Sequence, residues 1–157
     1  MKFGLIAGNG KFPFMVVEGA RQSGVPLVVA AIREETDPEM DQRAERVKWV
    51  GIGQLGRMIR FFKEEGVEKA IMAGQVKHVQ IFSRAVPDAR MLKVLLKLPR
   101  RNTNALIGAI ASELQSEGIE LVEPVRTHRD GARSFYFRDP DGVLIQLLYH
   151  PPISDAR

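Results

Sequence analysis

The sequence Phe-Gly-Leu-Ile-Ala-Gly-Asn-Gly-Lys, residues 3–11, sets the expectation for the first part of the chain. Its short apolar run Phe3–Ala7 has the character of a buried parallel strand, and glycines follow it at once. Pro13 suits the first turn of a helix, where a missing N–H costs nothing, and Gly24 suits the end of that helix. The pattern predicts a strand, a tight turn and a helix.

The same alternation continues along the first two-thirds of the chain. We expect further strands at residues 27–32, 47–50, 69–73 and 119–125, and helices at 54–65, 88–98 and from 102 or 103 to 118. The acidic stretch at 34–39 is interpreted as a surface connection. Alternating strands and helices with short connections predict an α/β fold, a Rossmann-like parallel sheet with helices on both faces.

The C-terminal part of the sequence has a different pattern. Residues 134–138 and 143–149 have strand character on either side of the turn sequence Asp-Pro-Asp-Gly at 139–142, which predicts an antiparallel hairpin. We therefore divide the chain into a Rossmann-like domain, residues 1–122, and a C-terminal hairpin tail, residues 123–157.

The composition excludes several classes of protein. With 157 residues, 45% of them hydrophobic and 27% charged, the chain has a globular rather than a disordered balance. It contains no cysteine, which excludes a disulfide framework, a thiolate zinc site and a cysteine nucleophile. The first residues form too short an apolar run for a signal peptide, and no stretch reaches membrane-spanning length. We therefore expect a cytoplasmic protein.

Basic residues are concentrated between residues 76 and 101. This segment contains seven Lys or Arg residues and a single acidic residue, Asp88. On the predicted helix at 88–98, we expect Arg90, Lys93 and Lys97 to face an anionic lipid surface while Leu92, Leu95 and Leu96 pack inward. The alternative is an ordinary solvated helix face. No nucleic-acid-binding motif accompanies the charge, so we expect no nucleic-acid partner.

Three glycine-containing loops follow predicted strands. The first contains Gly8, Asn9, Gly10 and Lys11, the second contains Gly53 and Gln54, and the third contains Gly74 and Lys77. Glycine lets the main chain approach an anion, a helix N-terminus presents N–H groups, and lysine adds positive charge. Because parallel strands end along one edge of a sheet, we expect these residues to line one phosphate-binding site. The alternative at each loop is a turn or a close contact that itself requires glycine.

The glycine loops do not match the standard nucleotide motifs. In the first loop, Pro13 stands where the dinucleotide motif has its third glycine, and this loop is not a P-loop, which is longer and ends in Lys-Ser or Lys-Thr. A literal G-x-G-x-x-G occurs at 51–56, but it follows the third strand and lacks the acidic residue expected for a ribose contact. The three histidines show no metal-site spacing, and no Ser-His-Asp signature is visible. The residues alone therefore give no catalytic residue and no metal ligand.

Four motifs, in order, resemble a known family. They are Gly-Leu-Ile-Ala-Gly-Asn-Gly-Lys-Phe-Pro (4–13), Trp-Val-Gly-Ile-Gly-Gln-Leu-Gly (49–56), Ile-Met-Ala-Gly-Gln-Val-Lys (71–77) and Arg-Asn-Thr-Asn-Ala-Leu (101–106). Together, residues 1–122 resemble the N-terminal domain of LpxI-type UDP-2,3-diacylglucosamine pyrophosphatases of lipid A biosynthesis. The resemblance implies a nucleotide-sugar-binding domain of a two-lobed enzyme. With a divalent metal, Mg²⁺ or Mn²⁺, and water, such an enzyme cleaves a UDP-sugar lipid substrate into UMP and a lipid monosaccharide phosphate. It also implies peripheral contact with the inner membrane.

The sequence departs from this family in two places. Thr103 and Asn104 stand where the family often has acidic residues, and residues 123–157 do not resemble the family's second lobe, which is thought to hold the catalytic acids. Instead, residues 118–124 and 133–148 resemble the end of a glyoxalase-type vicinal-oxygen-chelate module. Gln146 stands where that module normally has a glutamate metal ligand, so we expect no working chelate site.

Three hypotheses follow for the function. The first is a truncated or fused UDP-2,3-diacylglucosamine pyrophosphatase that keeps the nucleotide-sugar phosphate site. The second is a non-catalytic phosphate- or nucleotide-binding module, or one that self-associates, because the apolar residues of the hairpin need a partner surface. On that ground we expect a homo-oligomer. The third is a glyoxalase-like metalloprotein.

Overall fold

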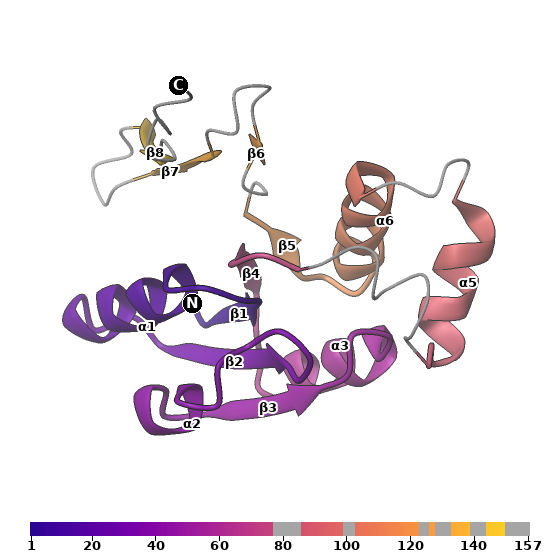
Figure 1. Ribbon diagram of the computed structural model, residues 1–157, viewed down its shortest axis with the longest axis horizontal. Coiled ribbons are helices and arrows are strands. Elements are labelled where there is room, and N and C mark those ends of the chain that lie inside the picture. The colour runs from indigo at the N-terminus through magenta and orange to yellow at the C-terminus, as the bar shows by residue number, and fades with distance from the viewer. Residues whose placement is uncertain (77–85, 99–102, 123–125, 128–132, 139–143, 150–157) are drawn as a thin grey trace, which may run out of the picture. The chain divides into compact units, whose positions relative to one another are not determined.

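The computed structural model describes residues 1–76, 86–98, 103–122, 126–127, 133–138 and 144–149. The chain divides into two compact units, Met1–Leu121 and Val122–Arg157. The first unit contains a parallel sheet with helices and the second an antiparallel sheet (Figure 1). None of the helices in the described ranges combines the length and the apolar character needed to cross a membrane.

A five-stranded parallel sheet forms the centre of the first unit. Its strands are β1 (Phe3–Ala7), β2 (Leu27–Ile32), β3 (Val47–Val50), β4 (Lys69–Ala73) and β5 (Glu120–Leu121), in the order β3-β2-β1-β4-β5. The chain winds from β1 outward to β3 and then crosses to β4 on the other side of β1. Open α/β sheets bind ligands where the winding reverses, which is here at the carboxyl ends of β1 and β4. The prediction of a Rossmann-like parallel sheet is confirmed.

Helices cover both faces of this sheet. They are α1 (Phe12–Gln22), α2 (Met40–Arg43), α3 (Leu55–Glu64), α5 (Ala89–Lys97) and α6 (Thr103–Ser116). One hydrophobic core contains residues of α1 and α2 with Leu5 and Val29, whereas the other contains residues of α3, α5 and α6 with Ile6 and Val28. Successive strand residues point to opposite faces, and each face is therefore sealed by its own helices.

In helix α3 the apolar residues that recur every three or four positions pack into the core. The residues predicted to share one face, Leu55, Met58, Ile59 and Phe62, are all buried. The Phe62 ring lies against Gly4 of β1, where an added Cβ would lie 2.8 Å from a ring carbon. Glycine at position 4 thus makes room for an aromatic side chain whose burial contributes about 1.5–3 kcal/mol.

The connection between β2 and β3 agrees only in part with the prediction of a surface stretch at 34–39, because Glu34 and residues 37–39 are exposed and the two residues between them are buried. Glu35 and Thr36 are 7% and 5% exposed, and residues 40–43 form the short helix α2. The Thr36 hydroxyl donates a hydrogen bond of 2.7 Å to the carbonyl oxygen of Ala7 at the end of β1. The Thr36 hydroxyl is tolerated in this buried place because it is hydrogen-bonded to a main-chain group.

The prediction that the three leucines of α5 pack inward is wrong for two of them. Met91 and Val94 are buried, whereas Leu92 and Leu96 are exposed rather than packed inward. Only Leu95 of the three predicted leucines packs, partly buried, against the core. The helix therefore turns two leucines toward solvent.

The second unit contains β6 (Arg126–Thr127), β7 (Arg133–Arg138) and β8 (Leu144–Tyr149) in one antiparallel sheet. Phe135 pairs with Leu147 and Phe137 with Ile145 in the predicted hairpin, which is confirmed. The expected turn at 139–142 lies outside the described residues. Of the strand expected at 119–125, residues 120 and 121 form β5, and residues 123–125 lie outside the described ranges.

Candidate functional site

The loops that follow β1 and β4 are hydrogen-bonded to each other. The Gly8 N–H donates to the Ala73 carbonyl (2.8 Å), and the Asn9 N–H to the Gln75 carbonyl (2.7 Å). The Gln75 N–H returns a bond of 2.9 Å to the Asn9 carbonyl. Residues 8–11 and 74–75, called here the switch-point loops, therefore form one structure where the winding of the sheet reverses.

Two glycines permit this close contact between the loops. An added Cβ at Gly8 would lie 2.7 Å from the Gln75 carbonyl oxygen. One at Gly74 would lie 2.7 Å from the Asn9 carbonyl oxygen, and Gly74 also has a φ of +90°. Larger residues would push the loops apart, so the glycines at 8 and 74 serve contact within the chain.

All residues of the switch-point loops except Gly8 are exposed, and Gly10 and Lys11 stand next to the start of α1. Gly10 has a φ of +100°, and an added Cβ there would meet nothing within 4 Å. Lys11 occupies the N-cap position of α1, and its side chain makes no cap hydrogen bond. Within the described residues, no acceptor is recorded for the main-chain N–H groups of Gly10 and Lys11. These two amides, the Asn9 carboxamide and the Lys11 ammonium can meet an anion at a helix N-terminus.

Of the predicted first-loop donors, the amides of Gly8 and Asn9 are used between the loops. Gly74 lies in the same pair of loops, and Lys77 lies outside the described residues. No sequence signal identified Gln75 as the residue that joins the third loop to the first. Its pairing with Asn9 joins residues 66 positions apart and depends on the sheet order.

The β3–α3 loop, residues 51–54, is filled by other parts of the chain. An added Cβ at Gly53 would lie 2.7 Å from the Val86 carbonyl oxygen, and the Gly53 carbonyl accepts a bond from the Asp88 N–H (3.0 Å). The Gln54 side chain accepts a bond of 2.8 Å from the Gly51 N–H within the same loop. Gly53 and Gln54 therefore lie at the predicted sheet edge, but at β3, two strands from β1.

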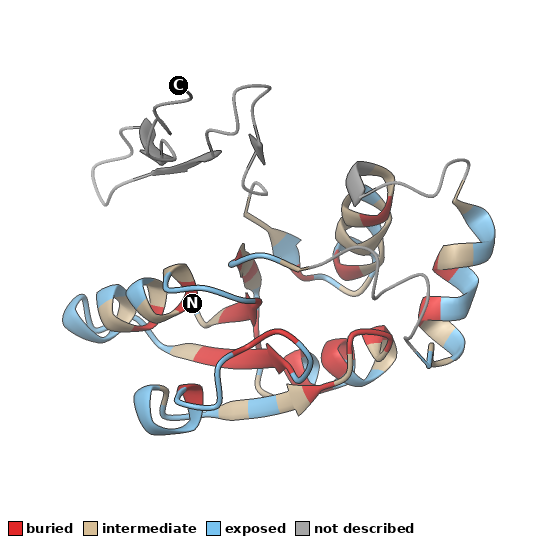
Figure 2. Cartoon of the chain, viewed as in Figure 1, coloured by how far each residue is buried: buried red, intermediate tan, exposed pale blue. Residues whose placement is uncertain are grey.

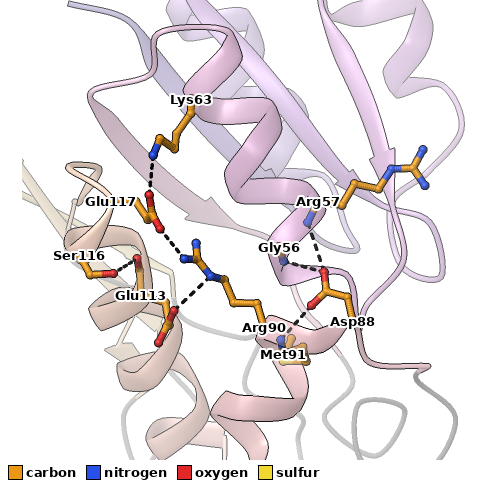
Figure 3. Close-up of polar contacts among 9 residues, drawn as sticks. All are labelled: Gly56, Arg57, Lys63, Asp88, Arg90, Met91, Glu113, Ser116 and Glu117. Atoms are coloured by element: carbon orange, nitrogen blue, oxygen red, sulfur yellow. Dashed lines mark hydrogen bonds and ion pairs between the residues drawn. The ribbon is translucent and has the colours of Figure 1, made fainter.

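The carboxylate of Asp88 caps two helices at once (Figure 3). It accepts hydrogen bonds from the N–H groups of Gly56 (2.7 Å) and Arg57 (3.2 Å) in α3 and of Met91 (2.9 Å) in α5. A negative group at a helix N-terminus is favourable, and here the protein itself supplies it. The N–H of Gly56, the last glycine of the G-x-G-x-x-G stretch, and the N–H of Arg57 therefore already have a hydrogen-bond acceptor.

An ion-pair network joins α3, α5 and α6 (Figure 3). Arg90 contacts Glu113 (3.4 Å) and Glu117, and Lys63 contacts Glu117 (2.5 Å). Hydrogen bonds from Lys63 and Arg90 lower the pKa of Glu117 to about 2. Arg90, predicted to face lipid with Lys93 and Lys97, is therefore engaged within the first unit.

The described residues do not fit the divalent metal that the sequence resemblance implies. Among them, no group of three or more His, Asp or Glu side chains could hold a metal ion. The side chains of the switch-point loops are those of Asn9, Lys11 and Gln75, whereas Mg²⁺ and Mn²⁺ sites are normally built around carboxylates. This part of the chain is suited to hold an anion.

The sequence matches known proteins over most of its length. Residues 2–130 match the LpxI N-terminal domain family. Over 123 residues the sequence is 34% identical to the UDP-2,3-diacylglucosamine pyrophosphatase LpxI of Caulobacter vibrioides, an alignment that covers 76% of this chain and 43% of that protein. The chain thus spans less than half the length of this relative. It belongs to the family of LpxI N-terminal domains.

Proposed function

We propose that this chain is the nucleotide-sugar-binding part of a UDP-2,3-diacylglucosamine pyrophosphatase and that its switch-point loops hold the diphosphate. The observation that carries the proposal is the exposed Gly10–Lys11 segment at the N-terminus of α1, fixed where the sheet reverses its winding. The relative with 34% identity bears the name of this activity.

The chemistry of the loops supports an anionic ligand. A diphosphate needs several hydrogen-bond donors and positive charge, and the Gly10 and Lys11 amides, the Lys11 ammonium and the positive end of α1 meet at one place. A hydrogen bond to a charged group contributes about 1.5–3 kcal/mol. Gly53 and Gln54 lie two strands away in a loop that residues 86–88 fill, so we expect them to take no part in the diphosphate contact, whereas Gly8 and Gly74 would shape the floor of the site.

The proposed reaction is hydrolysis of the phosphoanhydride, giving UMP and a lipid monosaccharide phosphate. The described residues would bind and orient the diphosphate and offset its charge. A divalent metal, Mg²⁺ or Mn²⁺, would supply Lewis-acid chemistry to the complete enzyme, with ligands from outside the described residues.

The proposed substrate has consequences for location and partners. A UDP-sugar that carries acyl chains resides at a membrane surface, so we infer a cytoplasmic protein in peripheral contact with the inner membrane. Self-association through the hairpin of β7 and β8 remains a prediction.

A second candidate function is binding without turnover. The described residues offer donors for an anion and no metal-binding group, which favours a module that holds a nucleotide sugar for another protein or lobe. Release of UMP from the lipid substrate in the presence of Mg²⁺ or Mn²⁺ would favour the enzyme, and tight binding without UMP release would favour the module.

Calorimetric titration with a water-soluble UDP-sugar tests the binding site. Replacing Lys11 by Gln should weaken binding about tenfold, in line with the loss of one charge-assisted hydrogen bond. The matched control is Lys48→Gln, which removes an exposed lysine on β3. It should bind like the wild type. No heat at millimolar ligand with folded protein, or equal losses in both variants, would contradict the proposal.

A further inference from the structure

Helix α5 presents two leucines to solvent. Leu92 is 47% exposed and Leu96 is 78% exposed, whereas Met91 and Val94 on the inner side are 3% and 4% exposed. Residues four positions apart lie on the same side of a helix, so the two leucines form one apolar stripe. Val86, just before the helix, is 85% exposed. Figure 2 shows exposed and buried stretches alternating along α5.

Two lysines accompany the exposed leucines. Lys93 and Lys97 directly follow Leu92 and Leu96, and both are exposed. Each is turned about 100° around the helix from the leucine before it, so the lysines flank the stripe along one side. The helix contains no acidic residue, and none of the ion pairs recorded between described residues includes Lys93 or Lys97.

Hydrogen bonds and ion pairs on the inner side of α5 join it to α3 and α6, and they thereby fix the direction in which its outer side faces. Asp88 ties the start of α5 to α3, and Arg90 ties its first turn to Glu113 and Glu117 of α6. Glu113 and Glu117 therefore neutralise the charge of Arg90. The charges of Lys93 and Lys97 lie on the same outer side of the helix as the leucines.

We propose that the outer face of α5, made of Leu92, Lys93, Leu96 and Lys97 with Val86 beside it, docks on an anionic lipid bilayer. The leucines enter the boundary between headgroups and acyl chains, and the lysine ammonium groups reach lipid phosphates while their stems lie along apolar surface. Lysine is depleted in protein–protein interfaces, so its place next to each leucine favours a lipid surface. This inference rests on the proposed membrane contact and names the surface that makes it.

Co-sedimentation of the 157-residue chain with lipid vesicles tests the proposal. The wild type should bind vesicles that contain phosphatidylglycerol and not vesicles of phosphatidylcholine alone, and binding should weaken as salt rises. Leu92→Ser with Leu96→Ser should reduce binding on the order of tenfold or more. Lys93→Gln with Lys97→Gln should reduce it about fivefold per lysine.

The matched control removes exposed apolar residues elsewhere. Met15 on α1 and Val25 before β2 are 63% and 36% exposed, and Met15→Ser with Val25→Ser should bind vesicles like the wild type. Thermal denaturation shows that each variant is folded. The leucine variant should also bind a soluble UDP-sugar like the wild type, which separates this test from that of the phosphate site.

Three results would overturn the proposal. They are absence of wild-type binding to anionic vesicles, wild-type binding by the leucine variant, and an equal loss in the control. A wild-type dimer in analytical ultracentrifugation that the leucine variant converts to a monomer would assign the face to a second copy of the chain and would also overturn it.

Discussion

The switch-point loops and the β3–α3 loop look alike in sequence and differ in use. Each follows a parallel strand, and each contains a glycine whose added Cβ would lie 2.7 Å from a main-chain oxygen. In the switch-point loops the contact is between two neighbouring loops, and Gly10 and Lys11 remain exposed. In the β3–α3 loop the contact is with residues 86–88, and Asp88 occupies the start of α3. Glycine spacing therefore indicates that two main-chain segments approach each other closely. Whether a ligand can also bind there depends on the groups that surround the loop.

The largest expected effect tests the tight contact in the switch-point loops. Gly74→Ala combines a left-handed φ of +90° with an overlap at 2.7 Å, and should destabilise the fold by about 3 kcal/mol. Gly10→Ala has a similar φ, +100°, but open space, and should cost only about 1 kcal/mol. Urea denaturation measures both. Equal losses would show that the contact between the loops adds nothing to the strain.

A somewhat smaller loss of stability is expected when the hydrogen bonds that Asp88 accepts beside the β3–α3 loop are removed. Asp88→Ala removes the acceptor for amides of two helices and should destabilise the fold by about 2 kcal/mol in urea denaturation. Asp88→Asn keeps one carbonyl acceptor and should lose less. An alanine variant as stable as the wild type would show that the capping bonds are not what holds residues 86–88 on the loop.

The pH dependence tests the ion-pair network that joins α3, α5 and α6. The pKa of Glu117 falls from 4.5 to about 2, so its ionised form stabilises the fold fully above pH 4.5 and loses this effect as the pH drops toward 2. Glu117→Gln should therefore lower the Tm at pH 7, and the difference from the wild type should shrink below pH 4.5. The control Glu45→Gln changes an exposed glutamate near β3 and should show no such trend. A difference that is independent of pH would contradict the ionic origin.

The smallest expected effect compares the two helix N-termini directly. Pyrophosphate should shift the amide NMR signals of Gly10 and Lys11 by a fraction of a part per million and leave those of Gly56 and Arg57 unchanged. In Asp88→Ala, where the start of α3 loses its carboxylate, the Gly56 signal should respond as well. Wild-type shifts at Gly56 as large as those at Gly10 would remove the distinction between the loops.

Much of the fold was predictable because its signals are local. The bounds of β1 to β4 agree with the prediction, since each is a short apolar run next to a glycine, a proline or a charged residue. Gly24, Gly66 and Gly118 follow helices and have positive φ values. These features depend on neighbours in the sequence.

The parts that sequence reasoning missed depend on contacts between distant segments. Thr36 is buried because it satisfies the carbonyl of Ala7, 29 residues away. Asp88 reaches Gly56, 32 residues away, and its role at α3 carries no local signal. Leu92 faces outward because Met91 and Val94 already fill the contact of α5 with the core. In each case the tertiary packing of distant segments decides which groups meet.

The reciprocal bonds between Asn9 and Gln75 have a consequence for affinity. Because they lock two otherwise independent turns together, the loss of conformational entropy of those turns occurs when the protein folds and not when a ligand arrives. A ligand of modest size can then bind a nearly rigid receptor with few contacts. Loosening this pair, even without touching Lys11, should weaken binding mainly through a less favourable entropy.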